Sequence, residues 1–255
     1  MKSFYDNIYS SRIFELRHPG DTLKDEIIFD EILKVNNKSD AKILDIGCGM
    51  GHTSILLSRI SHRLIGIDVS FEGVRVAKEK VKCDFMVSDS TRLPFKNEYF
   101  DIIVMKDILE HVENDSQAIK EVYRVLKMDG LLILYVPYSL DDAITFESIV
   151  KKISGYSIDD NIGHLRRYDI IILKDLLNNF EIIKSFYFAH LLFGIMSVFG
   201  TLYSKKKPEM KKDNKSKNRL LFISLMFIKL LGKAEFIILQ RFKGAGIFII
   251  AQKDR

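Results

Sequence analysis

A glycine-rich stretch, ILDIGCGMG at 43–51, is the first feature of the sequence that points to chemistry. Its glycines, Gly47, Gly49 and Gly51, follow a short apolar run and let the backbone approach a ligand closely. A glycine loop between a strand and a helix typically holds a phosphate or a nucleoside. The dinucleotide fingerprint places its third glycine one residue later, where this sequence has His52. The loop therefore indicates a nucleoside ligand and departs from the dinucleotide pattern.

Two aspartates restrict the ligand further. Asp68 ends the next apolar run, and an acid at about this distance from the loop, roughly 20 positions, accepts hydrogen bonds from ribose hydroxyls. Asp45 lies inside the first apolar run, just before the loop, where a carboxylate repels a pyrophosphate and attracts an ammonium group. The sequence therefore predicts a nucleoside joined to a cationic amino group, with no phosphate beside the loop.

Apolar runs and helical patterns alternate around these residues. Because most of the runs are continuously apolar, they predict a mostly parallel sheet with helices on both faces. Ligands of such sheets lie at the carboxyl ends of the strands, where the loop and both aspartates fall. The predicted strands are 42–46, 63–70, 83–89, 100–107, 131–137, 180–188 and 246–253, and the predicted helices are 4–35, 52–60, 71–81, 114–128 and 168–178.

Composition and charge exclude several classes of protein. The 255 residues are 47% hydrophobic, which suits one domain with insertions. Cys48 and Cys83 lack metal-ligand spacing, so we expect a reducing compartment and neither a disulfide nor a metal site. The N-terminus lacks the apolar core of a signal peptide, which predicts a cytoplasmic protein.

The net charge of +5 comes from one segment. Residues 205–219 hold eight Lys or Arg and two Asp or Glu, so the remainder of the chain is close to neutral. This distribution argues against nucleic acid as a partner, because a nucleic-acid binder spreads basic residues over a face. The segment is either a solvated loop or a contact with an anionic surface.

Four successive motifs resemble those of class I S-adenosylmethionine-dependent methyltransferases of the type 11 kind. They are ILDIGCGMG, IGIDVS, VSDSTRLPFKNEYFDIIVMKDILEHV and EVYRVLKMDGLLIL, and they cover about residues 41–137. The resemblance implies a Rossmann-like doubly wound α/β sheet of seven strands, mostly parallel with the last strand antiparallel. It also implies S-adenosyl-L-methionine as cofactor and S-adenosyl-L-homocysteine as product. Met128-Asp129-Gly130 replaces the family's usual Lys-Pro-Gly-Gly turn.

The resemblance implies roles for individual residues around the cofactor. Asp45 and the glycine loop would line its methionine part, and Asp68 would hold the ribose hydroxyls. Val69 and Asp89 would lie beside the adenine, and Lys106 follows the fourth strand, where cofactor and acceptor meet. The cofactor-binding residues expected in this way are Asp45, Gly47, Cys48, Gly49, Gly51, Asp68, Val69, Asp89, Ser90 and Lys106.

The candidate catalytic residues are Asp107 and His111. Displacement at a sulfonium methyl group needs mainly positioning, and a base is needed only when the acceptor is protonated. Asp107 follows the fourth strand, and His111 comes one helical turn later. His111 is either a base for the acceptor or a histidine at a helix start that only packs or caps.

A second polar cluster, GHLRRYD at 163–169, follows the fifth strand after a connection of about thirty residues. Arg166 and Arg167 could bind a phosphate or carboxylate bidentately. The alternative is a helix start in which they pair with Asp159 and Asp160. The expected acceptor-site residues are Tyr138, His164, Arg166, Arg167 and Tyr168.

A late insertion, residues 189–241, separates the last two strands. Residues 185–204 carry no Asp, Glu, Lys or Arg, and the apolar stretch 219–242 is interrupted by charges. Amphipathic helices joined by a basic loop are typical of a protein on an anionic membrane. The alternatives are a lid or a homodimer contact. The predicted division is an N-terminal helical segment at 1–40, a methyltransferase domain at 41–188 plus 242–255, and this insertion.

The sequence thus leads to one hypothesis with two alternatives. The hypothesis is a methyltransferase that acts on a lipid-like or polyprenyl-linked acceptor, peripheral on the cytoplasmic membrane face. The first alternative is a soluble small-molecule methyltransferase whose insertion is a lid or dimer contact. The second is a non-catalytic module that binds S-adenosylmethionine.

Overall fold

A computed structural model of the protein describes residues 19–35, 40–139, 163–189 and 230–254, together with Thr145, Ser148, Ile149 and Lys152. The predicted helix before Pro19 and most of the late insertion, 190–229, lie outside the described residues. None of the helices that are described is long and apolar enough to cross a membrane.

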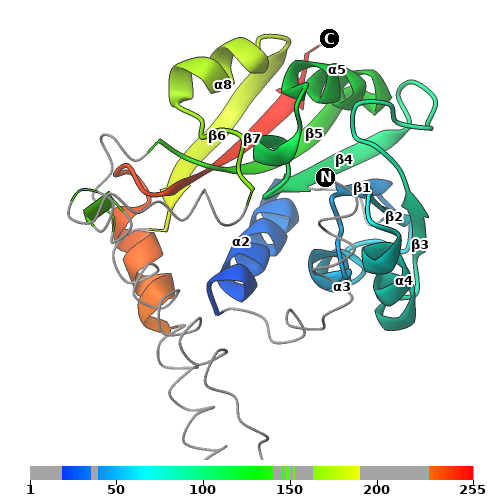
Figure 1. Ribbon diagram of the computed structural model, residues 1–255, viewed down its shortest axis with the longest axis horizontal. Coiled ribbons are helices and arrows are strands. Elements are labelled where there is room, and N and C mark those ends of the chain that lie inside the picture. The colour runs from blue at the N-terminus through cyan, green and yellow to red at the C-terminus, as the bar shows by residue number, and fades with distance from the viewer. Residues whose placement is uncertain are drawn as a thin grey trace, which may run out of the picture.

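The centre of the molecule is a seven-stranded sheet in the order β3-β2-β1-β4-β5-β7-β6 (Figure 1). β7 runs antiparallel to both of its neighbours, and the other pairs are parallel. This topology confirms the predicted Rossmann-like fold and its antiparallel last strand. The strands are β1 (Ile43–Ile46), β2 (Leu64–Asp68), β3 (Asp84–Val87), β4 (Phe100–Lys106), β5 (Leu126–Pro137), β6 (Phe180–Phe188) and β7 (Gly246–Lys253).

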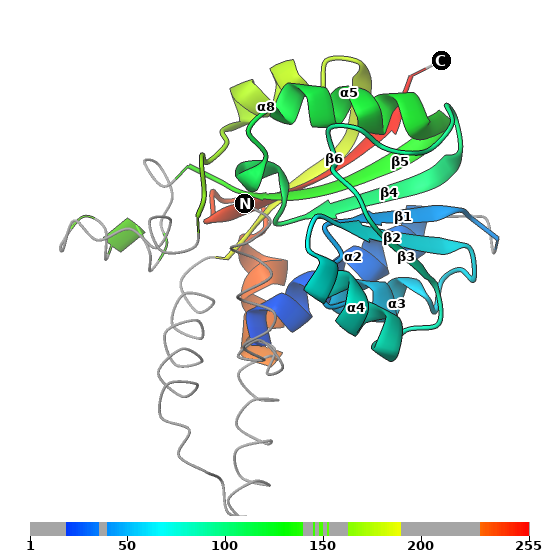
Figure 2. The ribbon, with the colours of Figure 1, turned by 45° about the vertical axis from the view of Figure 1, so that its right-hand side comes forward.

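Helices cover both faces of the sheet. Figure 2 shows α5 and α8 on one face and α2, α3 and α4 on the other. Side-chain caps begin several of them: Asn114 accepts a hydrogen bond from the Gln117 amide at 3.0 Å, and Asp169 accepts from two amides of α8. The labelled helices are α2 (Pro19–Val35), α3 (His52–Leu57), α4 (Phe71–Lys80), α5 (Asp115–Val125) and α8 (Ile170–Leu176), with a 3₁₀ turn, η2, at Leu109–His111; residues 230–239 form a further helix.

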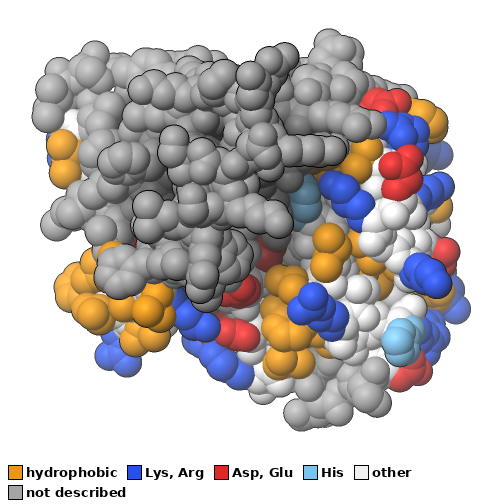
Figure 3. Space-filling view, turned by 90° about the horizontal axis from the view of Figure 1, so that it is seen from below, with side chains coloured by type: hydrophobic (Ala, Val, Ile, Leu, Met, Phe, Trp, Pro, Cys, Tyr) orange, Lys and Arg blue, Asp and Glu red, His pale blue; other side chains and the backbone are white. Residues whose placement is uncertain are grey.

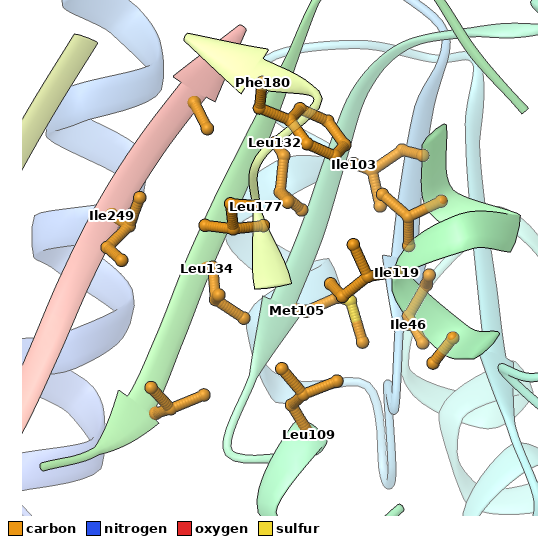
Figure 4. Close-up of a cluster of buried hydrophobic side chains, with 14 of the residues drawn as sticks. Ile46, Ile103, Met105, Leu109, Ile119, Leu132, Leu134, Leu177, Phe180 and Ile249 are labelled. Carbon is orange, nitrogen blue, oxygen red and sulfur yellow. The ribbon is translucent and has the colours of Figure 1, made fainter. Parts of the chain in front are cut away.

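Each face of the sheet buries its own apolar core. Neighbouring residues of β1 point to opposite sides, so Leu44 packs in the layer of α5 and Ile43 in the layer of α2. The core under α5 includes Ile119 and Ile249 (Figure 4). Both cores are continuous across the central strands, which explains why those strands read as unbroken apolar runs.

The start of β5 differs from the prediction. The helix expected to reach residue 128 ends at Val125, and β5 begins at Leu126. Its pairing with β4 then jumps from Phe100↔Leu126 to Ile102↔Leu131, so residues 127–130 form a bulge. Asp129 has a φ of 58° in this bulge. The Asp129-Gly130 signal therefore marks an irregularity inside a strand, since a left-handed residue suits a bulge as well as a helix end.

The apolar sheet faces should dominate stability. Ile249 is fully buried, whereas Ile183 on β6 is 46% exposed. We expect Ile249→Ala to lower the free energy of unfolding by about 2–5 kcal/mol, because it leaves a cavity. The matched change Ile183→Ala should cost under about 1 kcal/mol. Chemical denaturation of both variants measures the difference, and equal losses would contradict this account of the core.

Candidate active site

The glycine loop joins β1 to α3 at the carboxyl edge of the sheet. The amides of Gly47 and Cys48 both donate to the carbonyl of Ile67, at 2.7 and 2.9 Å, and this fixes the loop against β2. Gly47 has a φ of 75°, and a Cβ built there would lie 2.0 Å from the Ile108 side chain. Glycine is therefore required at this position by both backbone conformation and close packing.

Asp68 connects the loop to the end of β2. Its carboxylate accepts from the Gly49 amide at 2.9 Å and from the Ser70 amide at 2.8 Å, and the residue is buried. Each carboxylate oxygen has two lone pairs, so these bonds leave capacity for hydroxyl donors. The structure thus brings the predicted ribose-binding acid against the predicted loop.

Asp45 is buried beneath the loop, where Ser54 of α3 donates a 2.5 Å hydrogen bond to it. Burial raises the pKa of Asp45 to about 6, outweighing the Ser54 hydrogen bond and the positive charge of Lys106. The neighbouring Cys48 is also buried, and burial raises the pKa of its thiol well above the usual range. A thiol held protonated suits the predicted role of Cys48 as a small loop residue.

Two neighbouring residues of α2 pair with the end of β4. The Lys24 ammonium donates to Asp107 at 2.6 Å, and Asp25 accepts from Lys106 at 2.8 Å. Burial lowers the pKa of Lys24, but Asp107 and Asp21 outweigh it, so the pKa is raised and the ammonium stays charged. The sequence prediction named Lys106 and Asp107 but missed their partners.

Two histidines meet a buried carboxyl group just beyond Asp107. η2 carries Glu110 and His111, and His164 approaches from the segment before α8. The two imidazole rings lie 4.9 Å apart, centroid to centroid. Burial lowers the pKa of His111, and the neighbouring His164 lowers it further against the hydrogen bond to Gly163. A neutral His111 is compatible with its predicted role as a base.

The remaining acceptor-site candidates hold the chain together around η2. Arg166 forms an ion pair with Asp115 at 2.6 Å. Arg167 donates to the carbonyl of Tyr138 at 3.2 Å, and the buried Tyr168 hydroxyl lies 3.0 Å from Asp115. Asp115 of α5 is thus a partner of Arg166, and the alternative partners Asp159 and Asp160 lie outside the described residues.

The other cofactor candidates lie along the same edge. Val69 is half-buried and Ser90 is buried, whereas Asp89 is exposed and accepts from the Thr91 amide at 2.8 Å. A cavity of about 510 Å³ lies at the opposite edge, against the amino ends of β1 to β4. That cavity is therefore separate from the site. The contacts of these candidates with a bound cofactor remain predictions.

The fold and this edge are similar to those of class I S-adenosylmethionine-dependent methyltransferases. Residues 44–134 match the family model described as "Methyltransferase domain". The match confirms the methyltransferase class predicted from the four motifs.

Individual relatives agree with this class. The chain is 30% identical over 159 residues, 56% of its length, to the "Uncharacterized methyltransferase YcgJ" of Bacillus subtilis. It is 34% identical over 119 residues, 44% of its length, to the "Ubiquinone biosynthesis O-methyltransferase" of Pelagibacter ubique. These alignments cover 57% and 49% of the relatives, so the chain spans about half the length of the curated relatives it matches.

A solved structure extends the likeness to the whole fold. It is the S-adenosylmethionine-dependent methyltransferase, possible histamine N-methyltransferase, of Thermotoga maritima. The TM-score is 0.62 at 18% identity, with 98% of each chain covered. At this level of identity the likeness speaks for the fold alone.

The raised pKa of Asp45 generates a prediction about cofactor affinity. If Asp45 faces the ammonium group of the cofactor, binding favours the ionised carboxylate, and the affinity falls as protonation removes that charge. With a pKa of about 6 in the free protein, the Kd should rise about tenfold from pH 7 to pH 5. Calorimetric titration with S-adenosylhomocysteine, which keeps the ammonium group, measures this dependence.

The matched control for this titration is Asp84→Asn, at an exposed position on β3. Asp84→Asn should keep the wild-type slope, whereas Asp45→Asn should bind more weakly and lose the slope. If the Kd of Asp45→Asn still rises from pH 7 to pH 5 as in the wild type, another group causes the pH dependence.

Proposed function

We propose that the protein transfers the methyl group of S-adenosylmethionine to a lipid-like acceptor at a membrane surface. The observation that supports a lipid-like acceptor is an exposed apolar face on the helix formed by residues 230–239, called helix 230–239 below. Leu230, Ile237 and Ile238 are 64%, 61% and 70% exposed. Such a contiguous apolar face in contact with water calls for an apolar partner.

The periodicity of helix 230–239 separates two faces. Leu230, Leu231, Ala234, Ile237 and Ile238 are exposed and fall on one side of the helix. The opposite side carries Phe236, which packs against Phe186 and Phe188 of β6 at 5.4 and 5.9 Å between ring centroids. The helix is thus anchored to the sheet through one face and free to bury the other in an apolar phase.

Positive charge accompanies the apolar face. Lys233 is exposed on helix 230–239, and Arg241 and Lys243 are exposed just after it. Figure 3 shows hydrophobic side chains gathered beside Lys and Arg at the side where this helix lies. The segment 205–219, with its net charge of +6, precedes the helix in the sequence. Apolar and cationic side chains together favour an anionic lipid surface.

Helix 230–239 lies at the same edge of the sheet as the cofactor loop. It leads into β7, whose first residue, Gly246, pairs with Pro137 at the carboxyl end of β5. The Tyr138 amide donates to the carbonyl of Ala245 at 2.8 Å. A protein lying on a membrane through this helix would therefore present its cofactor edge toward the lipid.

The proposed reaction is an in-line displacement at the methyl group of the sulfonium of S-adenosylmethionine. The acceptor atom bonds to the methyl carbon, the carbon–sulfur bond breaks, and its electron pair stays on sulfur. The residues of this chain would hold the cofactor through the glycine loop and Asp68, and would orient the acceptor over Asp107 and His111. Such positioning is worth several kcal/mol of the barrier.

The proposal predicts methyl transfer into lipid. With labelled S-adenosylmethionine, the purified protein should label the organic phase of a membrane extract and leave the soluble small molecules unlabelled. Asp68→Ala should abolish labelling by weakening cofactor binding, whereas the exposed Asp84→Ala should not. Label confined to the soluble fraction would support the small-molecule alternative. Cofactor binding without any labelling would support the non-catalytic module.

The membrane contact is tested by flotation with anionic liposomes. We expect the wild type to float with the liposomes. The double variant Ile237→Ser/Ile238→Ser should float less because it removes apolar contact with the lipid, and a separate deletion of 205–219 should float less because it removes positive charge. The matched control is Ile171→Ser with Ile172→Ser, which changes two exposed isoleucines of α8 on the opposite face of the sheet. Flotation lost equally in the control, or absent in the wild type, would contradict the membrane contact.

A further inference from the structure

Glu110 is a buried carboxyl group without a hydrogen-bond partner. Its side chain is 0% exposed, and neither of its oxygens has a partner among the described residues. A buried carboxylate is costly unless it is paired or coordinates a metal. The environment of Glu110 therefore calls for a bound partner, such as a cation, that would offset the burial of its carboxyl group.

Two imidazole nitrogens face the same carboxyl oxygen. The Nε2 atoms of His111 and His164 lie 4.0 and 3.8 Å from Oε1 of Glu110. These separations are too long for hydrogen bonds. One donor atom from each residue can be chosen so that all lie within 4.8 Å of one another. The three groups thus bring possible ligand atoms close together.

The His111 ring makes a hydrogen bond that is typical of a metal ligand. Its Nδ1 lies 3.0 Å from the carbonyl of Gly163. Because a carbonyl only accepts, Nδ1 carries the proton. A neutral ring then has its lone pair on Nε2, the atom that lies 4.0 Å from Oε1 of Glu110. A ligating histidine typically makes this second hydrogen bond, which fixes the ring and its tautomer.

The backbone holds the three residues together. Glu110 and His111 share the short turn η2, and the Leu165 amide donates to the carbonyl of Glu110 at 2.9 Å. His164 therefore belongs to a segment pinned directly to η2. Both histidine side chains retain slight exposure, 12% for His111 and 11% for His164, so the cluster lies just below the surface. A small ion can reach it from solvent.

We propose that Glu110, His111 and His164 bind a divalent transition-metal cation. Two imidazoles and one carboxylate are a donor set for Zn²⁺, Mn²⁺ or Fe²⁺ and leave at least one coordination position open. Ligand atoms around tetrahedral zinc lie about 3.3 Å apart, so binding would draw these groups inward by less than about 1.5 Å. The expectation of no metal site rested on cysteine spacing and did not consider this cluster.

The site adjoins the cofactor loop. Ile108, two residues before Glu110, is the residue that packs against Gly47. An acceptor hydroxyl in the open position would have its pKa lowered by the ion and lose its proton to water. Its oxygen would then bond to the methyl carbon, while the electron pair of the carbon–sulfur bond stays on sulfur. This role rests on the proposed methyl transfer, whereas the cation site does not.

Cation binding is tested without cofactor or acceptor. The untagged protein is stripped with a chelator and titrated with Zn²⁺, and separately with Mn²⁺, by calorimetry. We expect binding of about one ion per chain, with affinity at least tenfold weaker in His111→Gln and His164→Gln. The matched control, His62→Gln at an exposed histidine, should leave the affinity unchanged. No binding in the wild type, or equal binding in all variants, would overturn the site.

The variant Glu110→Gln tests whether Glu110 binds the cation or is only a buried carboxyl group. The change keeps the side-chain shape, and retained binding of S-adenosylhomocysteine shows that the variant is folded. We expect it to lose cation affinity and the rise in melting temperature that the ion gives the wild type. Unchanged cation affinity in the folded variant would overturn the role of Glu110. If cation binding holds and methyl transfer fails, only the proposed function is refuted.

Discussion

Burial of carboxyl groups at one edge of the sheet is the constraint on which the rest of the structure depends. Asp25, Asp45 and Asp68 are buried there, and a buried carboxylate requires a partner that offsets its loss of hydration. Glu110 is buried as well, but its oxygens have no hydrogen-bond partner among the described residues. Asp68 is held by amides, Asp45 by Ser54, and Asp25 by Thr53 and Lys106. α2 and α3 supply several of these partners and also pack into the apolar core through Leu23, Ile28 and Leu57.

The ion pairs of α2 tie an element outside the central sheet to the end of β4. Lys24 contacts Asp107 and Asp21, and its ammonium also lies 4.9 Å from the centroid of the Tyr135 ring. Asp107 has a φ of 54°, a conformation that needs support from its surroundings. The Asp107 carboxylate accepts from Lys24 and its amide donates to the Tyr135 carbonyl at 3.1 Å, so α2 contributes contacts at the point where cofactor and acceptor are expected to meet.

Features set by local sequence were predictable. The glycine loop, the acid that ends β2 and the apolar runs each depend on residues close together in the chain, and all were placed correctly. β6 and β7 have the predicted bounds because Gly246 and the run that follows it read as a strand by composition alone. The start of β5 was misplaced, because its first residues pair with β4 although the sequence reads as a continuing helix.

Features that join distant segments were not predictable. Lys24 and Asp107 are 83 positions apart, and no local pattern connects them. The sequence offers Asp159 and Asp160 as alternative partners of Arg166, and these lie outside the described residues; no local pattern points to Asp115 of α5, to which the fold brings Arg166. The sequence does not predict the burial of Glu110. A glutamate beside an apolar residue gives no sign that both of its oxygens are buried without hydrogen-bond partners.

The cofactor half and the acceptor half of the site have different origins in the chain. The family match ends at residue 134, and it includes the glycine loop, Asp68, Asp107 and η2. His164 and helix 230–239 lie beyond it, in segments that follow β5 and β6. The cluster of Glu110, His111 and His164 crosses this boundary, because two members come from the matched region and one from outside it. A cation there would couple the chemistry of methyl transfer to the part of this chain that we propose selects its acceptor.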